Sequence, residues 1–135
     1  ENEELEVLSY NATNETWLMV NNERPQFQNQ NVRQTINSAI NKDDIVTVAF
    51  NGLAVPAISQ CPYNFEGSTE ENADVYDVEK AKEYLDASGV DPSTLGFSII
   101  SSDDTKKRAA EVIQSNLKEI GIEATIESMD LATCL

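Results

Sequence analysis

The chain has 135 residues, a length that suits one domain with a real core better than two domains. Its formal net charge of −15 argues against binding nucleic acid or anionic membrane surfaces, because both attract cationic proteins. It contains no histidine, which excludes a Ser-His-Asp triad and any zinc or iron site with histidine ligands.

The N-terminal part predicts two strands. Residues 3–10 alternate between apolar and polar side chains, as a half-buried strand does. Residues 16–20, TWLMV, form a short continuous apolar run, which is typical of a buried strand. The turn-forming stretch 11–14 lies between them, so the two strands could pair as a hairpin.

Two helices are expected next, separated by few residues. Val32, Ile36, Ala39 and Ile40 recur at helical spacing after the turn that Pro25 imposes. Residues 43–50 repeat the pattern with an acidic first turn, which suits the positive end of a helix. The pair Asn51-Gly52 then offers the left-handed conformation that commonly ends a helix.

The middle of the chain predicts a loop and a third helix. Residues 53–67 read as an irregular connection because Pro56 and Pro62 interrupt them. Asp77 is a suitable N-cap for the following helix, and Gly89 is a suitable stop.

The last third predicts a βαβ unit. Residues 97–101 and 122–128 read as strands, and residues 105–120 between them carry the apolar stripe of a long helix. A crossover of this length predicts parallel strands with a right-handed connection, which places the chain in the α/β class.

The sequence offers few groups that could carry out catalysis or hold a metal or a phosphate. The carboxylate pairs are adjacent in sequence and therefore do not face each other as an acid/base dyad would, and no glycine-rich phosphate loop occurs. No catalytic residue, metal site or cofactor is predicted. Cys61 and Cys134 fit no metal spacing, and whether they form a disulfide stays open.

The loop between the first strand and the helix of the βαβ unit is a candidate ligand site. Ligands collect at the carboxyl ends of parallel strands, and helix N-termini attract carboxylates. Ser101, Ser102 and Thr105 supply hydroxyls there, Asp103 lies between them, and Arg108 follows with positive charge. The alternative is that Ser102 only caps the helix and that the basic residues are solvated.

Several of these segments together resemble the extracytoplasmic solute-binding proteins of peptide-type ABC importers. The matching segments are Val20-Asn21, Pro25-Gln26-Phe27, the run VRQTINSAINK from Val32 to Lys42, the loop residues Pro56-Ala57 and Pro62, and YDVEKAK from Tyr76 to Lys82. The chain departs from the family pattern at Thr35, where alanine is usual, at Phe65, where tryptophan is usual, and at Val78, which replaces proline.

The resemblance implies a fold and a domain organisation. Residues 1–135 would form one domain, the C-terminal lobe of a two-lobe periplasmic-binding-protein fold, with a mixed sheet that contains the βαβ unit and has flanking helices. The larger N-terminal lobe and a final return segment would lie outside this sequence.

The resemblance also implies a function. The chain would belong to the substrate-binding component of an ABC importer, with no enzyme activity, and would form one wall of a cleft for a peptide or another small solute. The protein would be extracytoplasmic, periplasmic or lipid-anchored, would dock on a membrane permease, and would be monomeric as a fragment. The expected ligand-binding residues are Trp17, Asn21, Tyr63, Phe65, Ser101, Ser102, Asp103, Thr105 and Arg108, whereas Arg33 and Gln34 are expected to make structural contacts. The alternatives are that Trp17 belongs to the core and that Tyr63 and Phe65 only fix their loop.

Two other functions stay open at this point. The same fold serves as the ligand-sensing domain of regulators, which an upstream DNA-binding domain would reveal. A small α/β enzyme is the weakest alternative, because the sequence has no histidine and no nucleophile motif.

Overall fold

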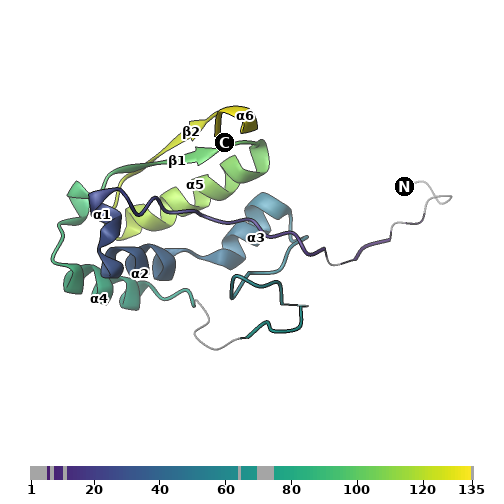
Figure 1. Ribbon diagram of the computed structural model, residues 1–135, viewed down its shortest axis with the longest axis horizontal. Coiled ribbons are helices and arrows are strands. Elements are labelled where there is room, and N and C mark those ends of the chain that lie inside the picture. The colour runs from purple at the N-terminus through teal and green to yellow at the C-terminus, as the bar shows by residue number, and fades with distance from the viewer. Residues whose placement is uncertain (1–5, 7, 11, 64, 70–74, 135) are drawn as a thin grey trace.

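A computed structural model describes residues 6, 8–10, 12–63, 65–69 and 75–134. In chain order, its elements are α1 (Pro25–Gln28), α2 (Gln30–Ala39), α3 (Lys42–Phe50), α4 (Val78–Ser88), the 3-10 turn η1 (Pro92–Thr94), β1 (Phe97–Ser101), α5 (Asp104–Glu119), β2 (Ala124–Ser128) and α6 (Leu131–Cys134). In Figure 1 the sheet lies on one side of α5, and α2 and α4 lie on the other. None of the helices within the described residues has the length and apolar character needed to cross a bilayer.

The βαβ unit forms as predicted. Strands β1 and β2 run parallel, with Phe97 opposite Ala124 and Ser101 opposite Ser128. Helix α5 packs against both strands, and the side-chain amide of Gln114 donates a hydrogen bond of 2.6 Å to the carbonyl of Ala124. Leu117 on α5 is completely buried. The α/β class is therefore confirmed, although the sheet within the described residues has two strands, both parallel, rather than a mixed arrangement.

Helices α2 and α4 form an antiparallel pair that is fastened at both ends. The side-chain amides of Asn29 and Asn31, at the start of α2, donate to the carbonyls of Ser88 and Ala87 at the end of α4. At the opposite ends, the backbone N–H of Asp77 donates to the carbonyl of Ser38. Each of these bonds satisfies a terminal helix group that has no partner within its own helix. The pair adds its apolar faces to the core formed with β1 and α5.

The predicted helix boundaries agree with the structure because the caps are local. Asp77 accepts from the backbone N–H of Lys80 at the start of α4, and Gly89 ends that helix at φ +69°. Asn51 and Gly52 end α3 with φ angles of +52° and +75°. Arg33 makes the expected structural contact, since its guanidinium donates to the carbonyls of Phe27 and Gln28 and fixes the turn before α2.

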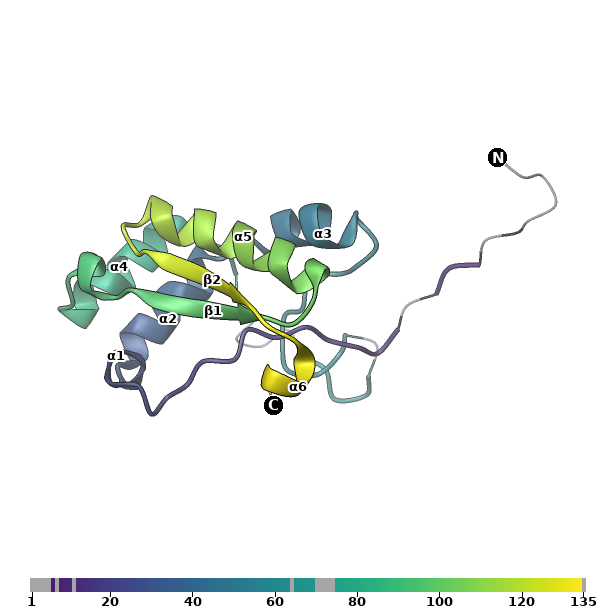
Figure 2. The ribbon, with the colours of Figure 1, turned by 90° about the horizontal axis from the view of Figure 1, so that it is seen from above.

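The N-terminal part differs from the prediction. Residues 16–20 have no strand structure, and neither do residues 6 and 8–10, so no hairpin forms within the described residues. Trp17 and Met19 are 51% and 90% exposed. A strand needs a partner for its backbone N–H and C=O groups, and this segment runs along the outside of the fold with no strand partner among the residues that the structure describes (Figures 1 and 2).

Candidate functional site

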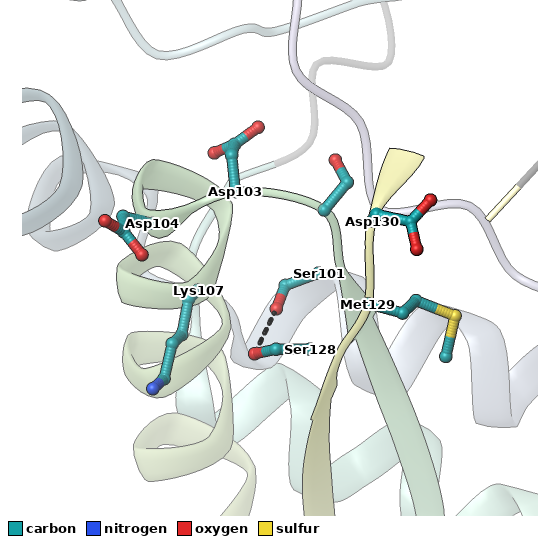
Figure 3. A pocket seen from close by; sticks show the side chains of 8 residues that line it. Ser101, Asp103, Asp104, Lys107, Ser128, Met129 and Asp130 are labelled. Atoms are coloured by element: carbon teal, nitrogen blue, oxygen red, sulfur yellow. Dashed lines mark hydrogen bonds between the residues drawn. The ribbon is translucent and has the colours of Figure 1, made fainter. Parts of the chain in front are cut away.

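A depression of about 340 Å³ lies at the carboxyl ends of β1 and β2. It is lined by three short segments: Ser101 to Asp104 at the end of β1, Lys107 on α5, and Ser128 to Asp130 at the end of β2. Figure 3 shows the two strand ends side by side, with Ser101 and Ser128 facing each other. Helix α5 begins at the edge of this depression, which is the place where open parallel sheets commonly hold ligands.

Strand register brings the two serines together. Ser101 and Ser128 are partners across the ladder, and their hydroxyl oxygens lie 3.2 Å apart. The Ser101 side chain is buried, whereas Ser128 is exposed. The backbone N–H of Met129 donates to the carbonyl of Ser101 at 3.1 Å, which continues the pairing one residue beyond the strands. The base of the depression is therefore a fixed pair of hydroxyls.

Asp103, rather than Ser102, caps helix α5. Its carboxylate accepts a 2.8 Å hydrogen bond from the backbone N–H of Lys106 and pairs with the Lys106 ammonium at 2.9 Å. The backbone hydrogen bond, reinforced by the Lys106 side chain, holds the pKa of the Asp103 carboxyl below its ordinary value. The Lys106 ammonium also donates to the hydroxyl of Ser102 at 2.8 Å. Ser102 and Asp103 are thus oriented by one lysine.

The opposite edge of the depression is also acidic. The Asp130 carboxylate accepts hydrogen bonds from the hydroxyl and the backbone N–H of Thr133, and the hydroxyl contact is the larger cause of its lowered pKa. Together with Asp103 and Asp104 it places three carboxylates around the depression, against the single ammonium of Lys107 among the lining residues. Hydroxyls and carboxylates are groups that accept hydrogen bonds from amide or ammonium N–H donors.

A second depression, of about 310 Å³, lies between the start of α3 and the loop that follows that helix. Its lining residues are Lys42, Asp43, Pro56, Ile58, Val75 and Tyr76. The Lys42 ammonium donates a 2.9 Å hydrogen bond to the carbonyl of Ala57 and so holds the loop close to α3. This depression shares no lining residue with the one at the strand ends.

The described residues contain no group of three or more Cys, Asp or Glu side chains arranged to hold a metal ion. The Cys61 thiol is free in the structure, and the side chain of Cys134, its possible disulfide partner, lies outside the described part of the chain.

Residues 1–134 match the family model of the bacterial extracellular solute-binding proteins, family 5 Middle. The chain belongs to this family. It is 30% identical over 131 residues to the glutathione-binding protein GsiB of Pectobacterium atrosepticum, an alignment that covers 96% of this chain and 25% of that protein. The chain therefore spans about a quarter of the length of the curated relatives that it matches.

Solved structures of family 5 relatives have the same fold. The protein AppA of Clostridium difficile superimposes with a TM-score of 0.67 at 33% identity, over 78% of this chain and 22% of that one. The periplasmic binding protein DppA of Helicobacter pylori, determined in complex with the peptide STSA, superimposes with a TM-score of 0.70 at 31% identity, over 87% of this chain and 23% of that one. The predicted fold family is confirmed.

The structure brings together only some of the residues predicted to bind a ligand. Ser101, Ser102 and Asp103 line the depression at the strand ends. Thr105 and Arg108 lie in the first turns of α5 but do not line it, and Arg108 reaches instead toward the carbonyl of Ala49 on α3.

The other four candidates lie away from the depression. Trp17 is half exposed in the segment before α1, and Asn21 accepts a hydrogen bond from the backbone N–H of Glu23 within a turn. Tyr63 and Phe65 are 47% and 52% exposed on the loop after α3. All four side chains are accessible, and none of them lines either depression.

Sequence reasoning missed five lining residues: Asp104, Lys107, Ser128, Met129 and Asp130. The predicted parallel βαβ unit contained the signal for three of them, because the carboxyl ends of parallel strands meet at one edge of a sheet. Applying the register to the second strand would have placed Ser128 beside Ser101. Lys107 has no comparable signal, because its place at the depression depends on how α5 is rotated against the sheet.

Proposed function

We propose that this chain is a ligand-binding lobe of the substrate-binding component of an ABC importer whose ligand is a peptide or a peptide-like solute. Its membership of the extracellular solute-binding family supports this function, as do the relatives described as binding glutathione or a peptide. The observation that carries the proposal is the polar depression at the carboxyl ends of β1 and β2, where the fold leaves hydroxyl and carboxylate groups accessible.

The depression forms one wall of the ligand cleft. Peptides carry backbone N–H donors along their length and an ammonium group at one end, so a wall rich in acceptors suits them. Ser128 offers an exposed hydroxyl, and Ser102, Asp103 and Asp130 offer further oxygens that local hydrogen bonds already orient. Tyr63, Phe65 and Trp17 present half-exposed rings, which can cover apolar side chains of a ligand.

The chain performs its function together with a second lobe. It is the C-terminal lobe of a hinged receptor, whose larger N-terminal lobe and return segment supply the opposite wall, and closure on the ligand allows docking on a membrane permease. This lobe catalyses no reaction. The receptor works outside the cytoplasmic membrane, free in the periplasm or held there by a lipid anchor. Because half of the contacts lie on the other lobe, this lobe alone binds its ligand weakly.

Isothermal titration of the intact protein, as its gene encodes it, with glutathione and with the peptide STSA tests this function. We expect at least one of the two probes to bind at micromolar strength. Ser128→Ala removes an exposed hydroxyl from the depression and is expected to weaken binding about three- to tenfold, the usual contribution of one hydrogen bond.

Thr125→Ala is the matched control, because it removes a hydroxyl from the same strand β2 at a position outside the depression. It should leave the affinity unchanged. Failure of both probes to bind would contradict the peptide assignment. Equal losses of affinity in Ser128→Ala and Thr125→Ala would show that the depression at the strand ends is not the binding wall.

A further inference from the structure

Helix α5 holds helix α3 at both ends. In the views of Figures 1 and 2 the two helices lie side by side, and they are in contact. The side-chain oxygen of Asn116 accepts a 3.0 Å hydrogen bond from the backbone N–H of Asn41, the N-cap residue of α3. Near the other end, the guanidinium of Arg108 donates to the carbonyl of Ala49 at 3.4 Å.

The spacing of these two contacts fits an antiparallel helix pair. Arg108 and Asn116 are eight residues apart on α5, and Asn41 and Ala49 are eight residues apart along α3. At 1.5 Å per residue, each interval spans about 12 Å, so both contacts form without bending either helix. The contact at Arg108 is thus part of a two-point attachment.

An arginine suits the C-terminal end of α3. The last carbonyls of a helix lack partners within the helix and carry partial negative charge, which a guanidinium neutralises. Ala49 is buried, whereas Arg108 is exposed, so the guanidinium remains hydrated while one N–H reaches inward. The same nitrogen lies 3.5 Å from the hydroxyl of Thr105, which orients the guanidinium.

This attachment joins two of the parts of the lobe that carry candidate ligand contacts. The loop that begins α5 forms one edge of the depression at the strand ends. The C-terminal end of α3 begins the stretch 51–63, which leads to Tyr63. We infer that Arg108 is a positioning residue, which fixes the base of this stretch relative to the depression and does not itself contact the ligand. The effect on affinity rests on the proposed function, whereas the attachment itself does not.

Hydrogen exchange of the intact, ligand-free protein tests the attachment. The backbone N–H groups of Gly52 and Leu53 donate to the carbonyls of Val46 and Phe50, so they report on the end of α3. Arg108→Met is expected to speed their exchange about three- to tenfold, which corresponds to losing one hydrogen bond to a charged donor in a solvated position. The amides of Ile113 and Leu117, in the middle of α5, should exchange as in the wild type.

Two further variants separate positioning from charge. Lys118→Met removes one positive charge from the exposed last turn of α5 and should leave exchange at Gly52 and Leu53 unchanged. Arg108→Lys retains the charge near the end of α3 but loses the planar fork, so it should restore part of the protection.

Affinity for glutathione and for STSA, measured by titration, completes the test. A positioning role predicts that Arg108→Met weakens binding about threefold or more and that Arg108→Lys recovers part of the loss. Unchanged exchange together with weaker binding would show that Arg108 contacts the ligand directly, and it would overturn the inference. Faster exchange at Gly52 and Leu53 with unchanged affinity for the probes would show that the attachment of α3 does not affect ligand binding. If the wild type binds neither probe, the proposed function fails, while the exchange rates still decide whether the attachment exists.

Discussion

Two short, largely apolar segments of this chain differ in structure, because one forms a strand and the other does not. Strand β1, FSIIS, pairs with β2 along its whole length, and its Ile99 is buried. Residues 16–20, TWLMV, are richer in apolar side chains, yet they form no strand and leave Met19 90% exposed. The difference shows that an apolar run becomes a strand only where a second segment supplies its backbone hydrogen bonds.

The two segments also differ in packing, because helix α5 covers β1 and β2. Helix α5 packs against β1 and β2 and buries Ala110, Ile113 and Leu117 in the common core. Residues 16–20 contribute much less to this core, because only Val20 packs against it. Apolar burial is the main favourable contribution to folding, so the core that the βαβ unit shares with α2 and α4 contributes more stability than residues 16–20 do.

The largest expected effect follows from Leu117, which is completely buried on α5. Leu117→Ala removes apolar contacts and leaves a cavity, so it should lower the free energy of unfolding by about 2–5 kcal/mol. Urea unfolding of the 135-residue chain, followed by circular dichroism, measures this change. Met19→Ala is the control of similar size in the exposed segment, and we expect its effect to stay within about 0.5 kcal/mol. Comparable losses of unfolding free energy in the two variants would contradict the difference in stability between α5 and residues 16–20.

A smaller effect is expected at Trp17, which is 51% exposed. Full burial of a large apolar side chain contributes about 1.5–3 kcal/mol, so Trp17→Ala should cost about 1 kcal/mol in the 135-residue chain. The proposed second lobe would cover this segment, and the same substitution should then cost more in the intact protein. Urea unfolding of both forms provides the comparison. An equal cost in both would indicate that the segment stays uncovered.

The smallest effect concerns the start of α5. The carboxylate of Asp103 caps this helix, and its pKa is lowered from the ordinary value of 3.8, chiefly by the backbone N–H of Lys106. A lowered pKa means that the ionised form stabilises the fold above pH 3.8 and that this stability is lost as the pH falls through the folded-state pKa.

Asp103→Asn retains a capping side chain but does not titrate. We therefore expect the stability difference between the wild type and Asp103→Asn to shrink as the pH is lowered from neutral to below 3.8, measured as urea midpoints. A difference that stays constant across this range would show that the charge of Asp103 contributes nothing to the cap.

The sequence predicted the helices and the βαβ unit well because their signals are local. Asp77 and Asn51 act on groups within a few residues of themselves, and the apolar spacing on α5 requires no knowledge of the rest of the chain. The candidate site was predicted in part for the same reason. Ser101, Ser102 and Asp103 follow directly from the end of a predicted strand, whereas Asp130 depends on the neighbouring strand.

The amino-acid sequence by itself determined the end of α3 and both ends of α4, that the last third is a βαβ unit, and that the chain resembles a family of solute-binding proteins. Only the tertiary structure decided that residues 16–20 have no strand partner in the described part of the chain, that Ser128 faces Ser101, and that Arg108 reaches Ala49. The physical reason is the distance along the sequence between the groups that pair. A helix satisfies its hydrogen bonds among residues three or four apart, whereas a strand or a long side chain takes its partner from segments that are distant in the sequence.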